Sequence, residues 1–220
     1  MVVKFPNVEE ANEDGLLAIG GDLSITTLTE AYTHGIFPWP VSEQYPLTWF
    51  APNPRGILEF VNYKRPKSFE KFLKKTDYYA KFNTDFEAII LHCANVKRKH
   101  ESGTWINQAI IDGYINMFHN GLAYCVGTYE KGELIGGLYG VSIGEIISGE
   151  SMFHLKDNAS KFALNFLVEH LQKSGLKWID TQMVTPLLKS FGGKEISRKV
   201  FMNKLKQLSP SCSRIEIFDS

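Results

Sequence analysis

Three side chains that could take part in hydrogen-bond or acid–base chemistry lie in otherwise apolar segments. Asp180 and Gln182 are two residues apart in a strand predicted over 176–182, so their side chains should leave on the same face. There the Asp180 carboxylate could accept a hydrogen bond from the Gln182 amide. Glu150 lies in another predicted strand, between small residues where a ligand can approach. The same positions also suit solvent-facing polar groups, so spacing alone leaves both interpretations open.

A basic surface is the second chemical feature. The formal net charge is zero, yet residues 1–54 carry −6 and residues 55–100 carry +6. Three lysines share one face of a helix predicted to begin at Pro66: Lys67, Lys71 and Lys74. A second basic cluster follows at 97–100. Such local density favours a polyanionic partner, nucleic acid in particular, although a solvated basic helix without a partner has the same pattern.

The elements that must position these residues follow from apolar periodicity and from turn residues. We expect further helices over 24–35, 86–96, 105–118, 158–174, 185–191 and 197–208, and strands over 124–129, 134–143, 145–153 and 176–182. The rest of the first 54 residues is predicted to be turns holding aromatic side chains. This order predicts an α/β sheet covered by helices, with a small N-terminal domain at 1–54 and a larger domain at 55–220.

Composition excludes several classes of protein. With 220 residues, 44% hydrophobic and 22% charged, the chain suits a globular protein and not a disordered one. It has no apolar run long enough for a membrane span, no secretion signal, and three widely separated cysteines. Phosphate-loop, dinucleotide-binding and zinc-protease motifs are absent from the sequence. We therefore expect a reduced, cytoplasmic protein without a metal or a cofactor.

A set of motifs makes the sequence recognisable. It closely resembles the bacterial leucyl/phenylalanyl-tRNA–protein transferases in eight segments, in the order and spacing of that family. They are 15–23 (GLLAIGGDL), 35–39 (GIFPW), 52–55 (PNPR), 103–106 (GTWI), 136–141 (GGLYGV), 149–153 (GESMF), 158–161 (NASK) and 179–182 (IDTQ). Any one of these motifs alone would be weak, but together they span most of the chain.

The resemblance implies an activity and a fold. A member of this family transfers Leu or Phe, with Met as a further candidate, from aminoacyl-tRNA to the N-terminal α-amine of a protein that begins with Arg or Lys. The product is an N-degron, a signal for proteolysis. The family fold is a small N-terminal domain followed by a mixed-sheet domain similar to the acyl-CoA N-acyltransferases (GNAT-like). It implies tRNA and protein partners, but no membrane, DNA, cofactor or metal.

The resemblance also implies roles for individual residues. Trp39 and Trp105 match the aromatic residues that hold the terminal adenosine, and Lys67, Lys71 and Lys74 match the basic patch for tRNA. The side-chain pocket for the transferred amino acid matches Leu138, Ile147, Met152, Leu164, Leu167 and Ile179. Glu150, Asp180 and Gln182 match the catalytic and acceptor-binding residues.

These roles lead to a mechanistic hypothesis. The Gln182 oxygen would hold the acceptor amine, Asp180 would polarise Gln182, and Glu150 would bind the acceptor's cationic end. Two residues depart from the usual family pattern: Leu187 replaces a His, which puts the local geometry in doubt, and Leu167 replaces an aromatic residue, which would enlarge the pocket.

Two alternatives remain on the sequence evidence. An acyl-CoA-dependent N-acyltransferase would need a pyrophosphate-binding loop of the form [RQ]xxGx[GA], which the sequence lacks. A tRNA-binding protein without catalysis would explain the charge segregation equally well. The presence of Asp180, Gln182 and Glu150 argues against the second alternative, and Leu187 is the one feature in its favour.

Overall fold

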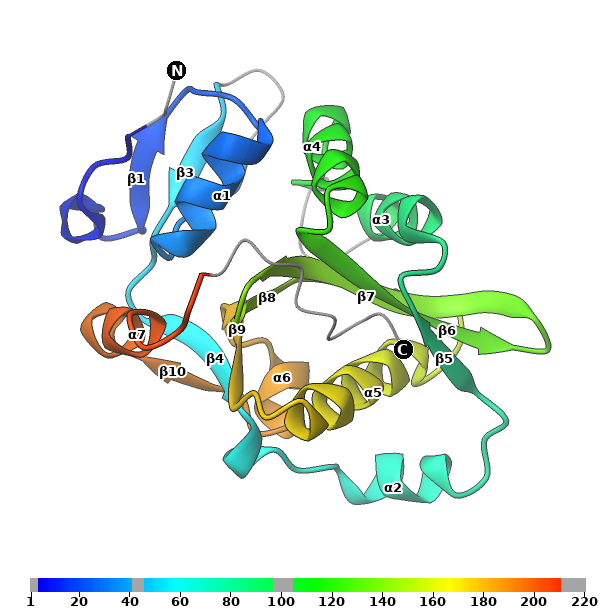
Figure 1. Ribbon diagram of the computed structural model, residues 1–220. Coiled ribbons are helices and arrows are strands. Elements are labelled where there is room, and N and C mark those ends of the chain that lie inside the picture. Colours follow the sequence, from blue (N-terminus) through cyan, green and yellow to red (C-terminus); the bar gives the residue numbers. More distant parts are fainter. Residues whose placement is uncertain (1–3, 41–45, 97–104, 211–220) are drawn as a thin grey trace.

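The computed structural model describes residues 4–40, 46–96 and 105–210, and these form two sheets surrounded by helices (Figure 1). The larger sheet has the strand order β10-β4-β9-β8-β7-β6-β5. Its strands are β4 (Arg55–Glu59), β5 (Tyr79–Phe82), β6 (Ala123–Glu130), β7 (Glu133–Ile143), β8 (Ile146–His154), β9 (Trp178–Gln182) and β10 (Lys194–Ile196). A mixed α/β fold is thereby confirmed.

The pairing of β8 with β9 positions the functional site. All other neighbouring strands of the large sheet are antiparallel, whereas β8 and β9 are parallel and pair at one register only, Ser148 with Asp180. Beyond that point the two strands diverge. The side chains of Glu150 and Gln182 come from the segments just past this divergence.

Helices cover both faces of the large sheet. On one face lie α3 (Phe86–Asn95) and α4 (Gln108–His119), and on the other lie α5 (Ala159–Lys173), α2 (Lys67–Leu73) and α6 (Pro186–Ser190) (Figure 1). A short 3₁₀ helix, η2 (Phe60–Asn62), follows β4, and α7 (Arg198–Leu205) lies against the β10–β4 end. Each face therefore has its own apolar core, and the cavity described below lies between them.

The N-terminal region contains a second sheet, which the sequence analysis missed. After the 3₁₀ helix η1 (Val8–Glu10), strands β1 (Leu16–Ile19), β2 (Phe37–Pro38) and β3 (Thr48–Phe50) pair in the order β1-β3-β2, and α1 (Ile25–Thr33) connects the first two. The prediction of turns alone was wrong here. Strands of two to four residues are too short to display the alternation by which a strand is recognised. The short strands β5 and β10 were missed for the same reason, and β4 was missed because four of its five residues are buried, so it shows no alternation.

The longer elements follow the sequence signals closely. Three helices begin where a side-chain oxygen accepts a hydrogen bond from the first turn: Ser24 from Thr27 N, Thr185 from Leu188 N, and Ser197 from Val200 N. The helix expected from Trp105 begins three residues later, after Asn107, whose side chain accepts from Ile110 N. No helix in the described part of the chain has the length and apolar character of a membrane span.

Candidate active site

A cavity of about 320 Å³ opens where β8 and β9 diverge. It brings together most of the residues predicted for the site: Trp39, Trp105, Leu138, Glu150, Met152, Leu164, Leu167, Ile179 and Gln182. They come from the residue that follows β2, from the segment before α4, from β7, β8 and β9, and from α5. Segments far apart in the chain therefore meet at one cavity.

The cavity has an apolar wall and a polar side. Leu164 and Leu167 from α5 pack with Leu138 and Ile179 from the sheet, and each is at most 3% exposed. Leu188 of α6 completes this wall. On the polar side lie Glu150 and Gln182. A ligand with an apolar group at one end and a hydrogen-bonding group at the other would suit this division.

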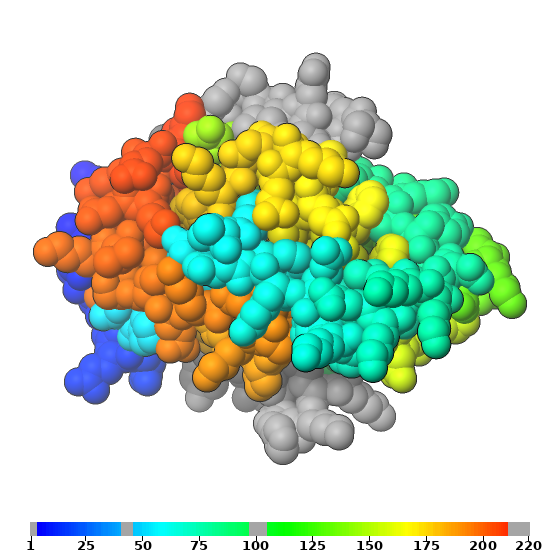
Figure 2. All heavy atoms as spheres, turned by 90° about the horizontal axis from the view of Figure 1, so that it is seen from below, coloured from blue at the N-terminus to red at the C-terminus, as the bar shows by residue number. Residues whose placement is uncertain are grey.

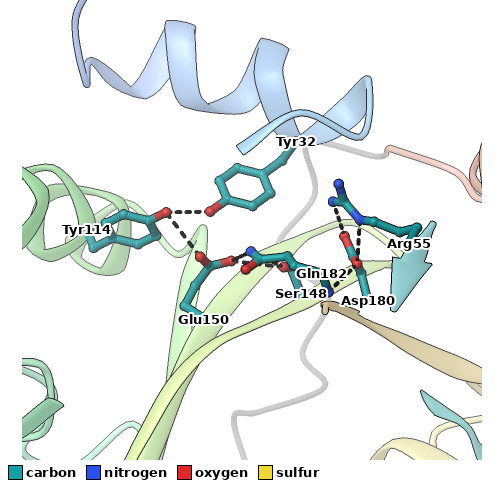
Figure 3. A network of polar contacts seen from close by, with 7 residues as sticks. All are labelled: Tyr32, Arg55, Tyr114, Ser148, Glu150, Asp180 and Gln182. Carbon is teal, nitrogen blue, oxygen red and sulfur yellow. Dashed lines mark hydrogen bonds and ion pairs between the residues drawn. The ribbon is translucent and has the colours of Figure 1, made fainter. Parts of the chain in front are cut away.

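Glu150 owes its position to a β-bulge. The β7–β8 register pairs Gly140 with Gly149 but Tyr139 with Ser151, so Glu150 is an extra residue in β8. Bulges of this kind redirect a side chain. The Glu150 carboxylate accepts hydrogen bonds from Ser148 Oγ at 2.8 Å, from Gln182 Nε2 at 2.9 Å and from the Tyr114 hydroxyl at 3.3 Å (Figure 3).

Two buried tyrosines complete this network. The hydroxyl groups of Tyr32 in α1 and Tyr114 in α4 are hydrogen-bonded to each other beside Glu150 (Figure 3). Burial, and then the nearby Glu150 charge, raise the pKa of both tyrosines well above the ordinary value, so they stay neutral. Burial also raises the pKa of Glu150, while its hydrogen bonds oppose that shift.

Gln182 is held through its backbone as well as its side chain. Its φ of 61° lies in the left-handed region, which costs a non-glycine residue about 1–3 kcal/mol. A Cβ on Gly56, its partner in β4, would lie 2.5 Å from the Met183 carbonyl carbon, so only glycine fits there. The side-chain Nε2 faces the Glu150 carboxylate and lies 3.4 Å from Ser148 Oγ. Since both neighbours can accept hydrogen bonds, the amide must turn its nitrogen toward them.

Asp180 makes no hydrogen bond with the Gln182 side chain, which corrects the hypothesis that it polarises that amide. Its Oδ1 accepts from the Gln182 backbone N–H at 2.9 Å. Arg55 then engages both carboxylate oxygens, with Nε at 2.9 Å from Oδ1 and Nη2 at 2.6 Å from Oδ2. The expectation of simple alternation was wrong because β9 also carries a bulge: Gly56 pairs with Gln182 but Ile57 pairs with Asp180. Asp180 therefore lies behind the cavity.

Other predicted residues lie at varying distances from the cavity. Ile147 is buried in the core behind the apolar wall and does not line the cavity. Leu187 is partly buried on α6, and its neighbour Leu188 is the residue that faces the cavity. Lys67 and Lys71 of α2, and Lys74 directly after it, are exposed, as expected. The basic cluster at 97–100 lies outside the described residues.

The partners that hold the polar groups were not predicted from the sequence. Tyr32 and Tyr114 lie on apolar helix faces, where a tyrosine has the spacing of an ordinary core residue. Arg55 and Ser148 occur in or beside recognised motifs, but nothing in their spacing connects them with Asp180 or Glu150. Only the contacts across the fold reveal these roles. Within the described ranges, no three His, Cys, Asp or Glu side chains come together as a metal site requires.

Two family models match the chain. The model for "Leucyl/phenylalanyl-tRNA protein transferase" matches residues 57–206, and the model for the N-terminal domain of the same family matches residues 21–53. Among similar proteins, the leucyl/phenylalanyl-tRNA–protein transferase of Sulfurimonas denitrificans is 43% identical over 93% of this chain and 89% of its own length. The protein of that name from Pseudoalteromonas atlantica is 45% identical over 92% of this chain and 87% of its own length.

Similarity to solved structures is weak. A GCN5-related N-acetyltransferase from Kribbella flavida aligns with a TM-score of 0.42 and 11% identity, over 74% of this chain and 58% of that one. The sequence relatives, and not this alignment, therefore decide the family.

Desolvation of Glu150 predicts a dependence of stability on pH. Because the pKa of Glu150 is raised in the folded protein above 4.5, the folded state binds this proton more tightly than the unfolded chain does. The carboxylate therefore destabilises the fold as the pH rises above 4.5 through the folded-state pKa. We expect Glu150→Gln to gain free energy of unfolding relative to wild type across that window. Urea unfolding of both proteins from pH 4 to 8 measures the difference; a difference independent of pH would contradict this account.

Proposed function

The chain belongs to the leucyl/phenylalanyl-tRNA–protein transferase family and is an aminoacyl-tRNA-dependent enzyme; from this premise we propose that it transfers Leu or Phe to the N-terminal α-amine of proteins that begin with Arg or Lys. The observation that carries the proposal is the position of the Gln182 amide and the Glu150 carboxylate beside an apolar cavity. The reaction takes place in the cytoplasm, where aminoacyl-tRNA is available.

The chemistry needs positioning more than it needs a nucleophile. In the aminoacyl ester the carbonyl is already activated: the acceptor amine bonds to the carbonyl carbon, the ester bond to the ribose breaks, and the proton lost by the amine balances the ribose hydroxyl that is released. The amine has a free pKa of about 7.7–8 and is partly neutral at cellular pH. Orientation of the two reactants and stabilisation of developing charge are then sufficient.

Gln182 orients the acceptor amine in this proposal. Its amide nitrogen is engaged by Glu150 and Ser148, which leaves the amide oxygen to accept a hydrogen bond from the incoming amine. Glu150, and not Asp180, is the carboxylate that polarises this amide. Asp180 contributes by holding the Gln182 backbone.

Glu150 also selects the charge of the acceptor. Among the described residues, Asp180 is neutralised by Arg55, whereas no lysine or arginine side chain pairs with Glu150. Glu150 is therefore the uncompensated negative charge of the cavity. A half-buried carboxylate of this kind favours a cationic ligand, and the cationic end of an Arg or Lys acceptor supplies one.

The apolar wall selects the transferred amino acid. The lining residues here have apolar side chains and offer a bound side chain no hydrogen-bond partner: Leu138, Met152, Leu164, Leu167 and Ile179. A Leu or Phe side chain needs no such partner, whereas a polar side chain would be left unpaired. The same wall separates Leu from Met only weakly, because a methylene is worth about 1–3 kcal/mol. Ile147 supports this wall from behind.

The two tryptophans hold the nucleotide end of the donor. Trp39 and Trp105 are half-buried residues at the cavity. Trp39 directly follows β2, and Trp105 lies in the segment before α4. An aromatic ring that stacks on a base contributes about 1–3 kcal/mol. Their rings would thus place the terminal adenosine beside the pocket for its amino acid.

The tRNA reaches the cavity from α2. Phe69 of α2 packs on Phe191 just after α6, with ring centroids 5.4 Å apart, and Lys64 N donates to Phe191 O. The segments around α2 (cyan to teal) and α6 (orange) adjoin on one face of the molecule (Figure 2). Since Leu188 of α6 lines the cavity, a helix of tRNA bound to Lys67, Lys71 and Lys74 could reach the cavity across α6.

A transfer assay tests the proposed function. The protein is mixed with leucyl-tRNA or phenylalanyl-tRNA and with peptides that begin with Arg, Lys, Asp, Ala or citrulline, the neutral analogue of Arg, and products are read by mass spectrometry. We expect addition of Leu or Phe to the Arg and Lys peptides alone, because only these bring a side-chain cation to Glu150. Transfer to the Asp or citrulline peptide would overturn the acceptor rule. Bound tRNA without transfer to any peptide would instead support the non-catalytic alternative.

Loss of the Gln182 amide tests its role in catalysis. Gln182→Ala should lower kcat about 100-fold, since one hydrogen bond that orients and stabilises the reacting groups is removed. Affinity for tRNA should change little, and its measurement also shows that the variant is folded. A variant of near-normal kcat would remove Gln182 from the mechanism.

Replacement of the α2 lysines tests the tRNA surface. The triple variant Lys67→Gln, Lys71→Gln, Lys74→Gln should bind tRNA more weakly, and the slope of log affinity against log salt should become shallower by about one for each lysine that contacts a phosphate. Binding is measured by filter retention over a salt series. A matched control replaces three exposed lysines away from α2 by Gln: Lys131, Lys199 and Lys206. Equal effects of both triple variants would contradict a specific surface on α2.

A further inference from the structure

We propose that Arg55 is a positioning residue of the active site, which sets the conformation of Gln182 through Asp180; this inference rests on the proposed role of Gln182. Arg55 lies at the start of β4, and it is 1% exposed. It does not line the cavity. Its effect on the reaction must therefore pass through the residues that it contacts.

One carboxylate oxygen connects Arg55 with Gln182. Asp180 Oδ1 accepts both from Arg55 Nε and from the Gln182 backbone N–H, each at 2.9 Å (Figure 3). The second guanidinium contact, Nη2 to Oδ2 at 2.6 Å, prevents the carboxylate from rotating about its Cβ–Cγ bond. A carboxylate fixed in this way fixes the direction of the Gln182 N–H.

The Gln182 backbone needs such an anchor. Its left-handed conformation is unfavourable for a residue with a side chain, and it persists only where the surroundings impose it. This conformation turns the side chain toward Glu150 and Ser148. If the anchor were loosened, the backbone could relax toward an extended conformation and carry the amide away from Glu150.

Stability alone does not account for the Arg55–Asp180 pair. Both side chains are buried, and the desolvation of two charges offsets much of their mutual attraction, so such pairs contribute little stability compared with apolar side chains of similar volume. The pair instead fixes the orientation of the Asp180 carboxylate, because a guanidinium offers two parallel donors at fixed angles.

Aromatic rings fix the guanidinium in turn. Its central carbon lies 4.7 Å from the centroid of the Phe37 ring and 4.6 Å from that of Phe201. Phe37 belongs to β2 of the N-terminal sheet, and Phe201 belongs to α7. A lysine at position 55 would keep the charge, but it would lose the planar stacking and the paired hydrogen bonds.

A double-mutant cycle tests this inference. The variants Arg55→Lys, Gln182→Ala and their combination are assayed for kcat, for KM toward both substrates and for thermal unfolding. We expect Arg55→Lys to lower kcat about 100-fold, as for a misplaced reacting group, with both KM values near wild type. In the Gln182→Ala background the same change should lower kcat no further, because the group that Arg55 positions is already absent.

A second buried arginine supplies the matched control. Arg198 at the start of α7 is 9% exposed and donates to Ala51 O at 2.7 Å, and it has no contact with Asp180. Arg198→Lys should lower the thermal stability but leave kcat near wild type. A loss of kcat like that of Arg55→Lys would show that any disturbed buried arginine slows the enzyme, and would overturn the inference.

Other outcomes separate this inference from the proposed function. Normal kcat in Arg55→Lys, or losses that multiply in the double variant, would overturn the inference and leave the role of Gln182 intact. Normal kcat in Gln182→Ala would overturn that role, and the inference with it. If Arg55→Lys unfolds, Arg55→Ala is assayed with added millimolar guanidinium or methylammonium. If guanidinium restores kcat and methylammonium does not, the planar pair of donors is needed, as proposed. If both additives restore kcat equally, or neither restores it, the inference is overturned.

Discussion

The buried ion pair between Arg55 and Asp180 is the interaction on which the arrangement of the active site depends. Removal of two charges from water costs several kcal/mol per ion, and this cost is offset only where the geometry of the pair is nearly ideal. The paired hydrogen bonds and the flanking rings of Phe37 and Phe201 meet that requirement. Strands β2, β4 and β9 and helix α7 thus converge on one guanidinium, so the N-terminal sheet and the C-terminal helix are coupled to the strand that carries Gln182.

The two carboxylates of the site behave differently because their surroundings differ. Asp180 is neutralised by Arg55 and holds a backbone N–H, a structural task. Glu150 is held by neutral donors from Ser148, Tyr114 and Gln182, and burial raises its pKa. The hydrogen bonds fix its orientation without cancelling its charge. Among the described residues that line the cavity, Glu150 therefore keeps an uncompensated negative charge, at some cost to the stability of the folded protein at neutral pH. In the proposed function this charge receives the cationic ligand.

The cavity recognises its two proposed substrates by different physical means. The donor is selected by shape and by the absence of hydrogen-bond partners along the apolar wall, a selection that rejects polar groups strongly and discriminates poorly among apolar groups of similar size. In the proposed function, the acceptor is selected by charge at Glu150. Because β8 and β9 diverge after a single paired register, these two regions lie side by side at the end of the sheet. An activated ester and an amine can thus be brought together without a nucleophilic side chain.

The sequence by itself determined the family, the longer helices with their capping residues, and half of the residues that line the cavity, because these depend on local signals and on motifs read in order. Ser24, Ser197 and Thr185 cap their helices through contacts three residues away, so no tertiary information was needed. Only the tertiary structure decided how Asp180 and Gln182 are used. Their relation depends on a bulge in β9, on a left-handed backbone at Gln182 and on an arginine 125 residues away in the chain. Each of these is imposed by a neighbouring strand, and alternation along one strand carries no information about its neighbour.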